Sequence, residues 1–206
     1  MEDEVLNLSE IQKDALKEIG NIGAGNAATA FAEFLNKKID MTVPSIDIVP
    51  LTEVPEITGS IEEKIFGILL TVNGEAPGEI LFILSEDSIK HLLKLVMEKE
   101  INPQNVGEIE VSALKEIGNI LSGSYLSSIN QMTGFGLTQS IPGFAHDMAG
   151  AILSSAMINL GDTSDFVLLI KTKFISEGNE IKGFFFFIPK LGSLHTILKA
   201  LGIDTE

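Results

Sequence analysis

The segment Leu16-Lys17-Glu18-Ile19-Gly20-Asn21-Ile22 returns unchanged at residues 114–120, 98 residues further along the chain. A wider polar pattern surrounds both copies with the same spacing. Its members are Asp14, Glu18, Asn21 and Pro44 in the first copy, and Ser112, Glu116, Asn119 and Pro142 in the second. Self-similarity at a fixed offset indicates a duplicated structural unit, here with one polar device in each copy.

The first copy lies in a predicted helix over residues 9–36. Apolar residues recur there at helical spacing, and Ser9 with Gln12 three residues later is typical of a capping box. Two short strands, 38–43 and 46–49, are expected on either side of Pro44, because proline cannot donate to a sheet ladder. Strands 64–72 and 78–84 form a predicted hairpin, and a helix is expected over 85–99.

The second half repeats this order. We expect helices over 106–132 and 144–157, a hairpin of strands 165–175 and 181–188, and a closing helix over 191–201. Residues 78–85 (GEILFILS) align with 183–190 (GFFFFIPK) at an offset of 105. The sequence therefore predicts an α+β fold: one pseudo-two-fold domain over 1–206, made of repeats at about 9–99 and 106–204. Its hairpins should join into one continuous, mainly antiparallel sheet, with the two long helices on one side.

Composition limits the partners. The net charge is −15, from 29 acidic and 14 basic residues, which argues against nucleic acid and anionic membranes. Cysteine is absent and three histidines are widely spaced, which excludes thiolate metal sites and a sequence-local zinc motif. Residues 117–146 carry no Asp, Glu, Lys or Arg, but polar side chains interrupt them too often for a membrane span. The acidic start, Met1-Glu2-Asp3-Glu4, favours a cytoplasmic protein.

Helical spacing places Asp14, Glu18 and Asn21 on one face, and the second copy does the same. For a single copy, a solvated surface is the ordinary interpretation. Duplication favours a function, because the Glu and Asn positions are kept while neighbours such as Lys13, which becomes Val111, have changed. The nearby glycines fit either tight helix packing or the close approach of a partner.

Two further features have ordinary explanations. Residues 23–28 match the dinucleotide pattern G-x-G-x-x-A, with Asp47 near the position of a ribose-binding acid. The strand that should precede this pattern is missing, so nucleotide binding is not expected. Asp147 is the only acid between Glu116 and Asp162. Its ordinary role would be to stabilise an early turn of the helix predicted over 144–157 with its negative charge, and the alternative is a specific contact with a partner.

The duplicated pattern, together with the segment KEIGNIGAGNAATA at residues 17–30, resembles the CheC family of chemotaxis phosphatases, which also includes CheX and the phosphatase portion of FliY. Both motif copies are intact, whereas CheX-type members keep one. The resemblance implies an enzyme that removes the phosphoryl group from the aspartyl-phosphate of the response regulator CheY. The alternative is a non-catalytic module that binds the phosphorylated receiver or the deamidase CheD.

The resemblance also implies roles for individual residues. Asn21 and Asn119 would orient the attacking water, and Glu18 and Glu116 would dock the regulator by pairing with a lysine. Supporting roles would fall to four further motif residues, Asp14, Pro44, Ser112 and Pro142. The magnesium ion would belong to CheY, with no metal or cofactor of this chain's own. CheD is the second implied partner, and Asp147 is the candidate for that contact.

Overall fold

The computed structural model describes residues 9–37, 40–160, 166–176 and 179–203. The first half forms α1 (Glu10–Leu35), β1 (Asp40–Pro50), the 3-10 turn η1 (Leu51–Glu53), α2 (Val54–Thr58), β2 (Lys64–Asn73), β3 (Gly78–Leu84) and α3 (Glu86–Met97). The second half forms η2 (Pro103–Asn105), α4 (Glu108–Thr133), β4 (Thr138–Gln139), β5 (Gly143–Met148), α5 (Ala149–Leu160), β6 (Phe166–Ser176), β7 (Asn179–Pro189) and α6 (Ser193–Ala200).

Helix α1 begins and ends as the sequence predicts. The Ser9 hydroxyl accepts a hydrogen bond from the Gln12 amide at 3.3 Å, and the Ser9 amide donates to Gln12 Oε1 at 2.8 Å. This reciprocal capping box satisfies two amides that the first helical turn leaves without partners. At the other end Asn36 adopts a left-handed conformation that stops the helix.

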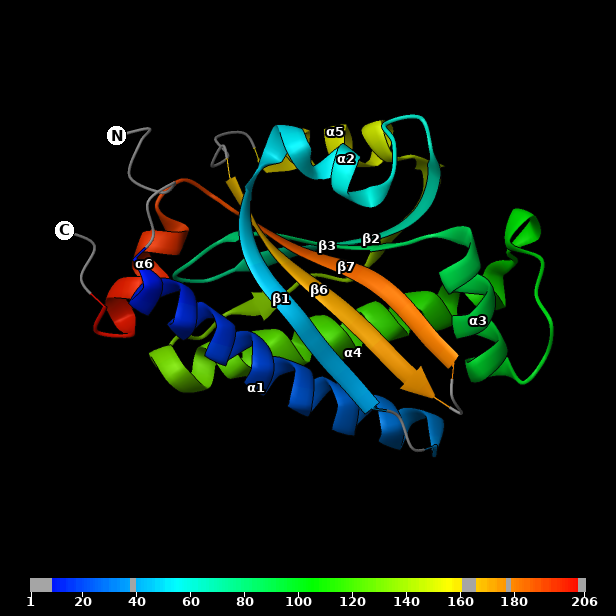
Figure 1. The fold of residues 1–206 in the computed structure, drawn as a ribbon, viewed down its shortest axis with the longest axis horizontal. Helices are drawn as coiled ribbons and strands as arrows, with labels where there is room; N and C mark the ends of the chain where they lie inside the picture. The colour runs from blue at the N-terminus through cyan, green and yellow to red at the C-terminus, as the bar shows by residue number, and fades with distance from the viewer. Residues whose placement is uncertain (1–8, 38–39, 161–165, 177–178, 204–206) are drawn as a thin grey trace.

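One antiparallel sheet forms the centre of the molecule, which confirms the predicted fold class. Its strand order is β1-β6-β7-β3-β2-β4, and β5 also pairs with β2. The halves therefore interlock: β1 pairs with β6 of the second half, and β4 and β5 pair with β2 of the first. Figure 1 shows α1 and α4 together on one face of the sheet, as predicted, with α2 and α5 on the other.

The strand pairing at the centre of the sheet reflects the duplication. Strands β3 and β7 pair there, and Leu81 lies opposite Phe186. These two residues are also counterparts at the repeat offset of 105. A residue that pairs with its own counterpart lies where a two-fold axis crosses the sheet. The boundaries of the repeats and their grouping into one domain stay a prediction.

The helix predicted over 144–157 is wrong in its first part. Residues 143–148 form β5, in which Asp147 pairs with Ile65 of β2, and α5 begins only at Ala149. A short apolar run does not distinguish strand from helix by periodicity. The edge of β2 offers unpaired backbone groups, and pairing with that edge decides the outcome.

The predicted break at Pro44 is a change of register, not the end of a strand. Strand β1 is continuous over Asp40–Pro50, but its pairing with β6 shifts between Thr42 and Ser45. Proline has no amide hydrogen to donate, so the ladder slips at this position and resumes beyond it. The side chain of Pro44 lies outside the described residues.

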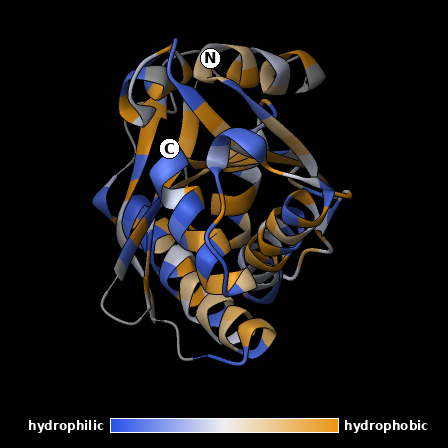
Figure 2. Ribbon diagram, turned by 90° about the vertical axis from the view of Figure 1, so that its right-hand side faces the viewer, coloured by the Kyte–Doolittle hydropathy of each residue, from blue (hydrophilic) through white to orange (hydrophobic). Residues whose placement is uncertain are grey.

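The sheet separates two apolar cores. Ile80, Phe82 and Leu84 of β3 face α1 and α4, whereas Leu81 and Ile83 face α5. Figure 2 shows this as largely orange strands between helices whose turns alternate in colour. Within the described ranges, no helix combines the length and apolar character that a membrane crossing requires.

Candidate functional site

The first motif copy lies on the outward face of α1. Asp14, Glu18 and Asn21 are all exposed, whereas Leu16 and Ile19 are buried against the sheet. Exposed and buried residues alternate along α1 because positions three and four apart lie on the same side of a helix. The structure therefore brings the three polar motif residues of α1 together, as their spacing indicates.

The second copy lies on α4 in the same arrangement, with one difference. Ser112 and Glu116 are exposed, but Asn119 is half-buried. The neighbouring residue Gln139, on β4, covers part of it: Gln139 Nε2 donates to Asn119 Oδ1 at 2.6 Å and to the Asn119 carbonyl oxygen at 3.0 Å. The two motif faces are thus chemically different.

The contact with Gln139 fixes the orientation of the Asn119 amide. A backbone carbonyl oxygen can only accept, so the Gln139 side chain must turn its nitrogen towards it. The second hydrogen of that nitrogen then points to Asn119, whose oxygen faces Gln139 and whose Nδ2 is left to donate elsewhere. We did not predict this residue from the sequence. The sequence does contain a sign of this difference: at the repeat offset of 98 the counterpart of Gln139 is Met41, whose side chain cannot donate a hydrogen bond.

The segment around Pro142 holds Gln139 against α4. The Ser140 amide donates to the Thr71 carbonyl oxygen at 2.9 Å, and the Thr71 amide donates to Ser140 Oγ at 2.9 Å. Pro142 is half-buried in the connection between β4 and β5. Pro142 therefore belongs to the strand connection beside Asn119, and Pro44 occupies the register shift of β1.

Three of the glycines have a packing role. A Cβ at Gly20 would lie 2.1 Å from Ile46 of β1, and a Cβ at Gly118 would lie 2.6 Å from Ile68 of β2. A Cβ at Gly23 would lie 2.4 Å from the Tyr125 ring. These glycines let the motif helices lie close to the sheet and to each other, so they leave no room for a partner.

The dinucleotide pattern at residues 23–28 lies in the middle of α1, where Gly23, Ala24 and Ala27 are buried. Dinucleotide sites need this pattern at the turn between a strand and a helix N-terminus, where backbone amides are free to bind phosphate. Here those amides belong to the helix interior. The pattern therefore lacks the strand-to-helix turn that a dinucleotide site requires.

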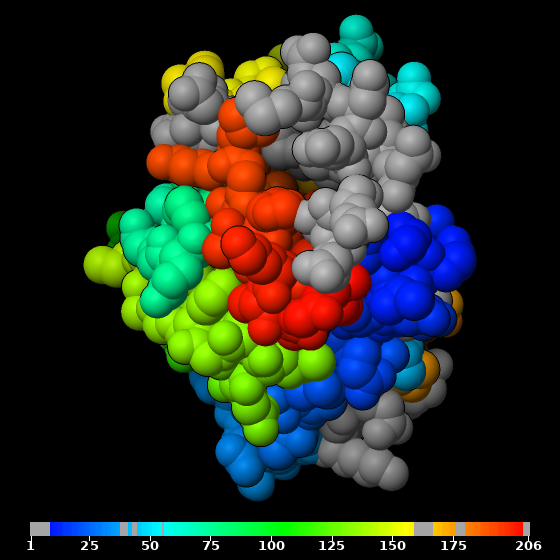
Figure 3. Space-filling view, turned by 90° about the vertical axis from the view of Figure 1, so that its left-hand side faces the viewer, coloured from blue at the N-terminus to red at the C-terminus, as the bar shows by residue number. Residues whose placement is uncertain are grey.

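The two motif faces lie towards opposite ends of the molecule. Figure 1 shows α1 and α4 running in roughly opposite directions, and Figure 3 shows the end of α4 (yellow-green) beside α6 (red) and α1 (blue). The helices touch beyond both motifs, where Asn26 Nδ2 donates to Ser128 Oγ at 3.2 Å and Gly23 packs on Tyr125. Each face can therefore meet a partner separately.

Comparison with known proteins agrees with this geometry. The model of the "CheC-like family" matches residues 11–48 and 109–144, and the chain is 32% identical over 200 residues to the "CheY-P phosphatase CheC" of Bacillus subtilis, covering 95% of this chain and 96% of that protein. The chain belongs to the CheC-like family. The two matched ranges contain both copies of the motif, including Pro44 and Pro142, together with Gln139.

A second relative of this CheC-like chain is a flagellar motor switch protein. The chain is 32% identical over 130 residues to the "Flagellar motor switch phosphatase FliY" of Bacillus subtilis, covering 62% of this chain but only 33% of that protein. The crystal structure of Thermotoga maritima FliY has the same fold, with a TM-score of 0.74 at 20% identity over 95% of this chain and 98% of that one. The middle domain of H. pylori FliM also shares it, with a TM-score of 0.67 at 11% identity over 94% and 99%.

Asp147 lies outside the ranges matched by the CheC-like model and away from both motif faces. It is exposed on β5, and its Oδ1 accepts a hydrogen bond from the Met148 amide at 2.8 Å, immediately before α5. It borders a groove of about 210 Å³ between β5 and α5, which Ala151 and Ser155 also line. This groove is on the face of the sheet opposite the motif helices.

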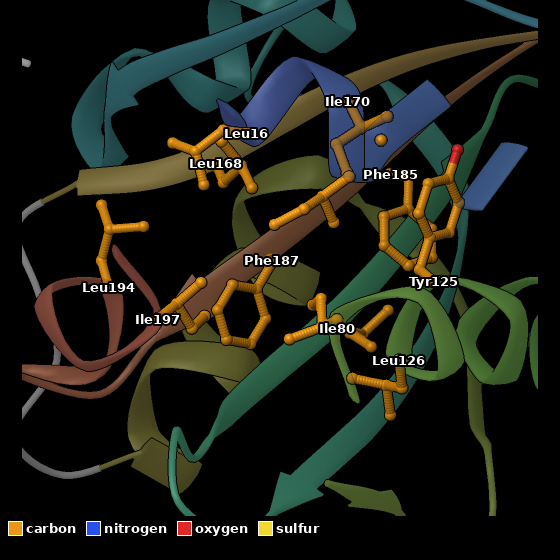
Figure 4. A pocket seen from close by; sticks show the side chains of 13 residues that line it. Leu16, Ile80, Tyr125, Leu126, Leu168, Ile170, Phe185, Phe187, Leu194 and Ile197 are labelled. Carbon is orange, nitrogen blue, oxygen red and sulfur yellow. The ribbon is translucent and has the colours of Figure 1, made fainter. Parts of the chain in front are cut away.

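The CheC-like fold also encloses a small apolar cavity of about 30 Å³ beneath α1 and α4. Figure 4 shows Leu16, Tyr125 and Phe187 pointing into it. None of the motif Glu and Asn residues line it. Across the described part of the chain, no group of three or more His, Cys, Asp or Glu side chains could hold a metal ion. The candidate site is therefore formed by two exposed polar helix faces, and not by a cleft.

Proposed function

We propose that this chain is a phosphatase that hydrolyses the aspartyl-phosphate of the response regulator CheY. The observation that carries the proposal is the exposed Glu and Asn pair, present at the same register on α1 and on α4 of a CheC-like protein. The name of its Bacillus subtilis relative supports the same substrate. The cytoplasm, where we place the protein, is the expected location of such a regulator.

The reaction needs little chemistry from this chain. The oxygen of a water molecule attacks phosphorus, the bond between phosphorus and the aspartate oxygen breaks, and the aspartate leaves as a carboxylate. Such a transfer depends on holding the water in line with the breaking bond. The amide of Asn21 can donate to the water and accept from it, and Asn119, whose oxygen accepts from Gln139, can donate to the water through Nδ2. These residues are the proposed water-orienting groups.

Glu18 and Glu116 have a different proposed role. A carboxylate repels a phosphoryl dianion, so it is better placed against a cation of the partner, most simply a lysine beside the phosphorylation site. Both carboxylates are exposed and can reach such a lysine. The magnesium ion that neutralises the phosphoryl group would be bound by CheY, and Asp14 and Ser112 would support the same faces.

The shape of the site supports a protein substrate. The motif residues project from helices, so a small phosphate ester would stay surrounded by water. A receiver domain that docks on the helix would exclude water and bring its own phosphoryl group to the Asn side chain. The alternative function is a non-catalytic module that binds the phosphorylated receiver on the same face without orienting a water.

Phosphate release from phosphorylated CheY distinguishes these functions. Asn21→Ala and Asn119→Ala together should abolish the acceleration over spontaneous hydrolysis, and each single change should leave the activity of the other copy. Neither residue is buried, so both variants should melt close to the parent. A parent protein that binds phosphorylated CheY without speeding phosphate release would establish the binding module instead. A double variant with the parent rate would refute the roles of the Asn residues.

We propose CheD as a second partner, bound beside Asp147. The exposed carboxylate and the adjoining groove lie on the face that the motif helices do not use. Asp147→Lys should therefore weaken CheD binding in a titration while phosphatase activity stays at the parent rate. Unchanged CheD affinity with a lower melting temperature would assign Asp147 to the start of α5 alone.

A further inference from the structure

We propose that each docking face continues beyond the Glu and Asn residues to an apolar anchor, Ile11 on α1 and Ile109 on α4. These isoleucines are 71% and 70% exposed, and they are counterparts at the repeat offset of 98 residues. The inference rests on the proposed function, because it identifies the surface that holds the phosphorylated receiver.

Helical geometry places the isoleucines in line with the motif. The positions 11, 14, 18, 21 and 25 are separated by three and four residues in alternation, as are 109, 112, 116, 119 and 123. At 100° per residue they fall within an arc of about 80°, and they span about 21 Å along the axis. The buried residues of α1, among them Leu16, Gly23 and Ala27, point the opposite way.

The fold itself gives no reason to keep an isoleucine here twice. Glu10 and Glu108, next to it, are also kept, but they are acids in the first turn of a helix and favour its dipole. Ile11 and Ile109 leave most of their surface in water at the end of a polar stripe. Single exposed apolar residues are common, but the same one at the same register in two copies indicates a contact.

The other end of the stripe is open. A Cβ at Gly25 would meet nothing within 4 Å, and one at Gly123 would make only an ordinary contact with Gln139 at 3.6 Å. Unlike Gly20 and Gly23, these glycines are not required by packing against the part of the chain that the structure describes. Each stripe therefore runs from an exposed isoleucine, past the Glu and Asn pair, to a helix surface without a side chain.

The order of residues along each stripe predicts the surface features of the partner. The receiver should carry an apolar patch about 10 Å from the lysine that meets Glu18 or Glu116, since seven helical residues separate the isoleucine from the glutamate. On the other side its backbone or a large side chain should lie against Gly25 or Gly123. Glutamate would provide the charge pairing, while isoleucine would provide apolar burial and hence affinity.

The test uses the full chain with one active copy at a time. In an Asn119→Ala background only the α1 face acts, and Ile11→Ala should raise KM for phosphorylated CheY about tenfold without lowering kcat. The anchor does not touch the water, so only binding should suffer. Alanine is a better helix former than isoleucine, so the melting temperature should not fall. The mirror experiment is Ile109→Ala in an Asn21→Ala background.

Ile158→Ala is the matched control. Ile158 is 79% exposed on α5, on the far side of the sheet, so its removal should leave KM at the background value. Gly25→Ala in the Asn119→Ala background tests the other end of the stripe, and should raise both KM and the melting temperature. A parent protein that does not accelerate phosphate release would refute the proposed phosphatase. An active parent whose KM is unchanged by Ile11→Ala and Ile109→Ala, or raised equally by Ile158→Ala, would overturn the anchor alone.

Discussion

Gln139→Met is the most informative change at the second motif face. Methionine is the residue that the first copy carries at this repeat position, and it removes the amide that holds Asn119 without shortening the side chain much. The two hydrogen bonds that are lost, at 2.6 Å and 3.0 Å, contribute roughly 0.5–1.5 kcal/mol each. Part of this is recovered, because Gln139 Oε1 is buried with no hydrogen-bond partner among the described residues and is removed as well.

The expected consequence is a slower second site. If a net preference of about 1.4 kcal/mol for one orientation of Asn119 is lost, the ratio of outward to inward orientations falls about tenfold, and the fraction of molecules with Nδ2 pointing outwards falls from about nine-tenths to about one half. We therefore expect kcat of this site to drop about twofold while KM changes little, because the docking residue Glu116 is untouched. The melting temperature should stay near that of the parent.

Single-turnover hydrolysis of phosphorylated CheY measures this effect in an Asn21→Ala background, where only the α4 face is active. The matched control is Gln139→Met in an Asn119→Ala background, where the α1 face acts and the rate should not change. A rate that stays at the background value would show that Gln139 does not position Asn119. A rate that rises would show that the hydrogen bonds hold the amide away from the water.

Two predictions concern stability. Gly23→Ala should lower the melting temperature, because its Cβ would lie 2.4 Å from the Tyr125 ring and overpacking costs about 1–3 kcal/mol. Gly25→Ala has open space around it and should raise the free energy of unfolding by about 1 kcal/mol. Thermal melts that rank the two variants in the opposite order would contradict this account of the packing. Burial raises the pKa of Glu79, which accepts a hydrogen bond from Thr71 Oγ1 at 3.0 Å. The folded pKa of Glu79 lies above its unfolded value, so its contribution to stability is lost as the pH rises through the folded pKa. The stability of Glu79→Gln relative to the parent should therefore increase as the pH rises above about 4.5. A difference in melting temperature between the two proteins that does not change with pH would refute this.

The sequence alone determined the features that depend on local geometry. Ser9 and Gln12 define the start of α1, because a capping box involves residues three apart. The spacing of Glu18 and Asn21, repeated at Glu116 and Asn119, fixes them on one helix face. The duplication also predicted the antiparallel sheet with both long helices on one side, because two similar halves bury their apolar faces in the same way.

Tertiary structure decided the features that depend on residues far apart in the chain. Asp147 lies on a strand and not on a helix because β5 pairs with the edge of β2, about 80 residues away in sequence. Gln139 reaches Asn119 only because β4 is held beside α4, and this contact makes two faces with the same Glu and Asn residues chemically unequal. Spacing within a helix states which side a residue faces, but not which distant side chain it meets there, because that partner is set by how the sheet brings separate segments together.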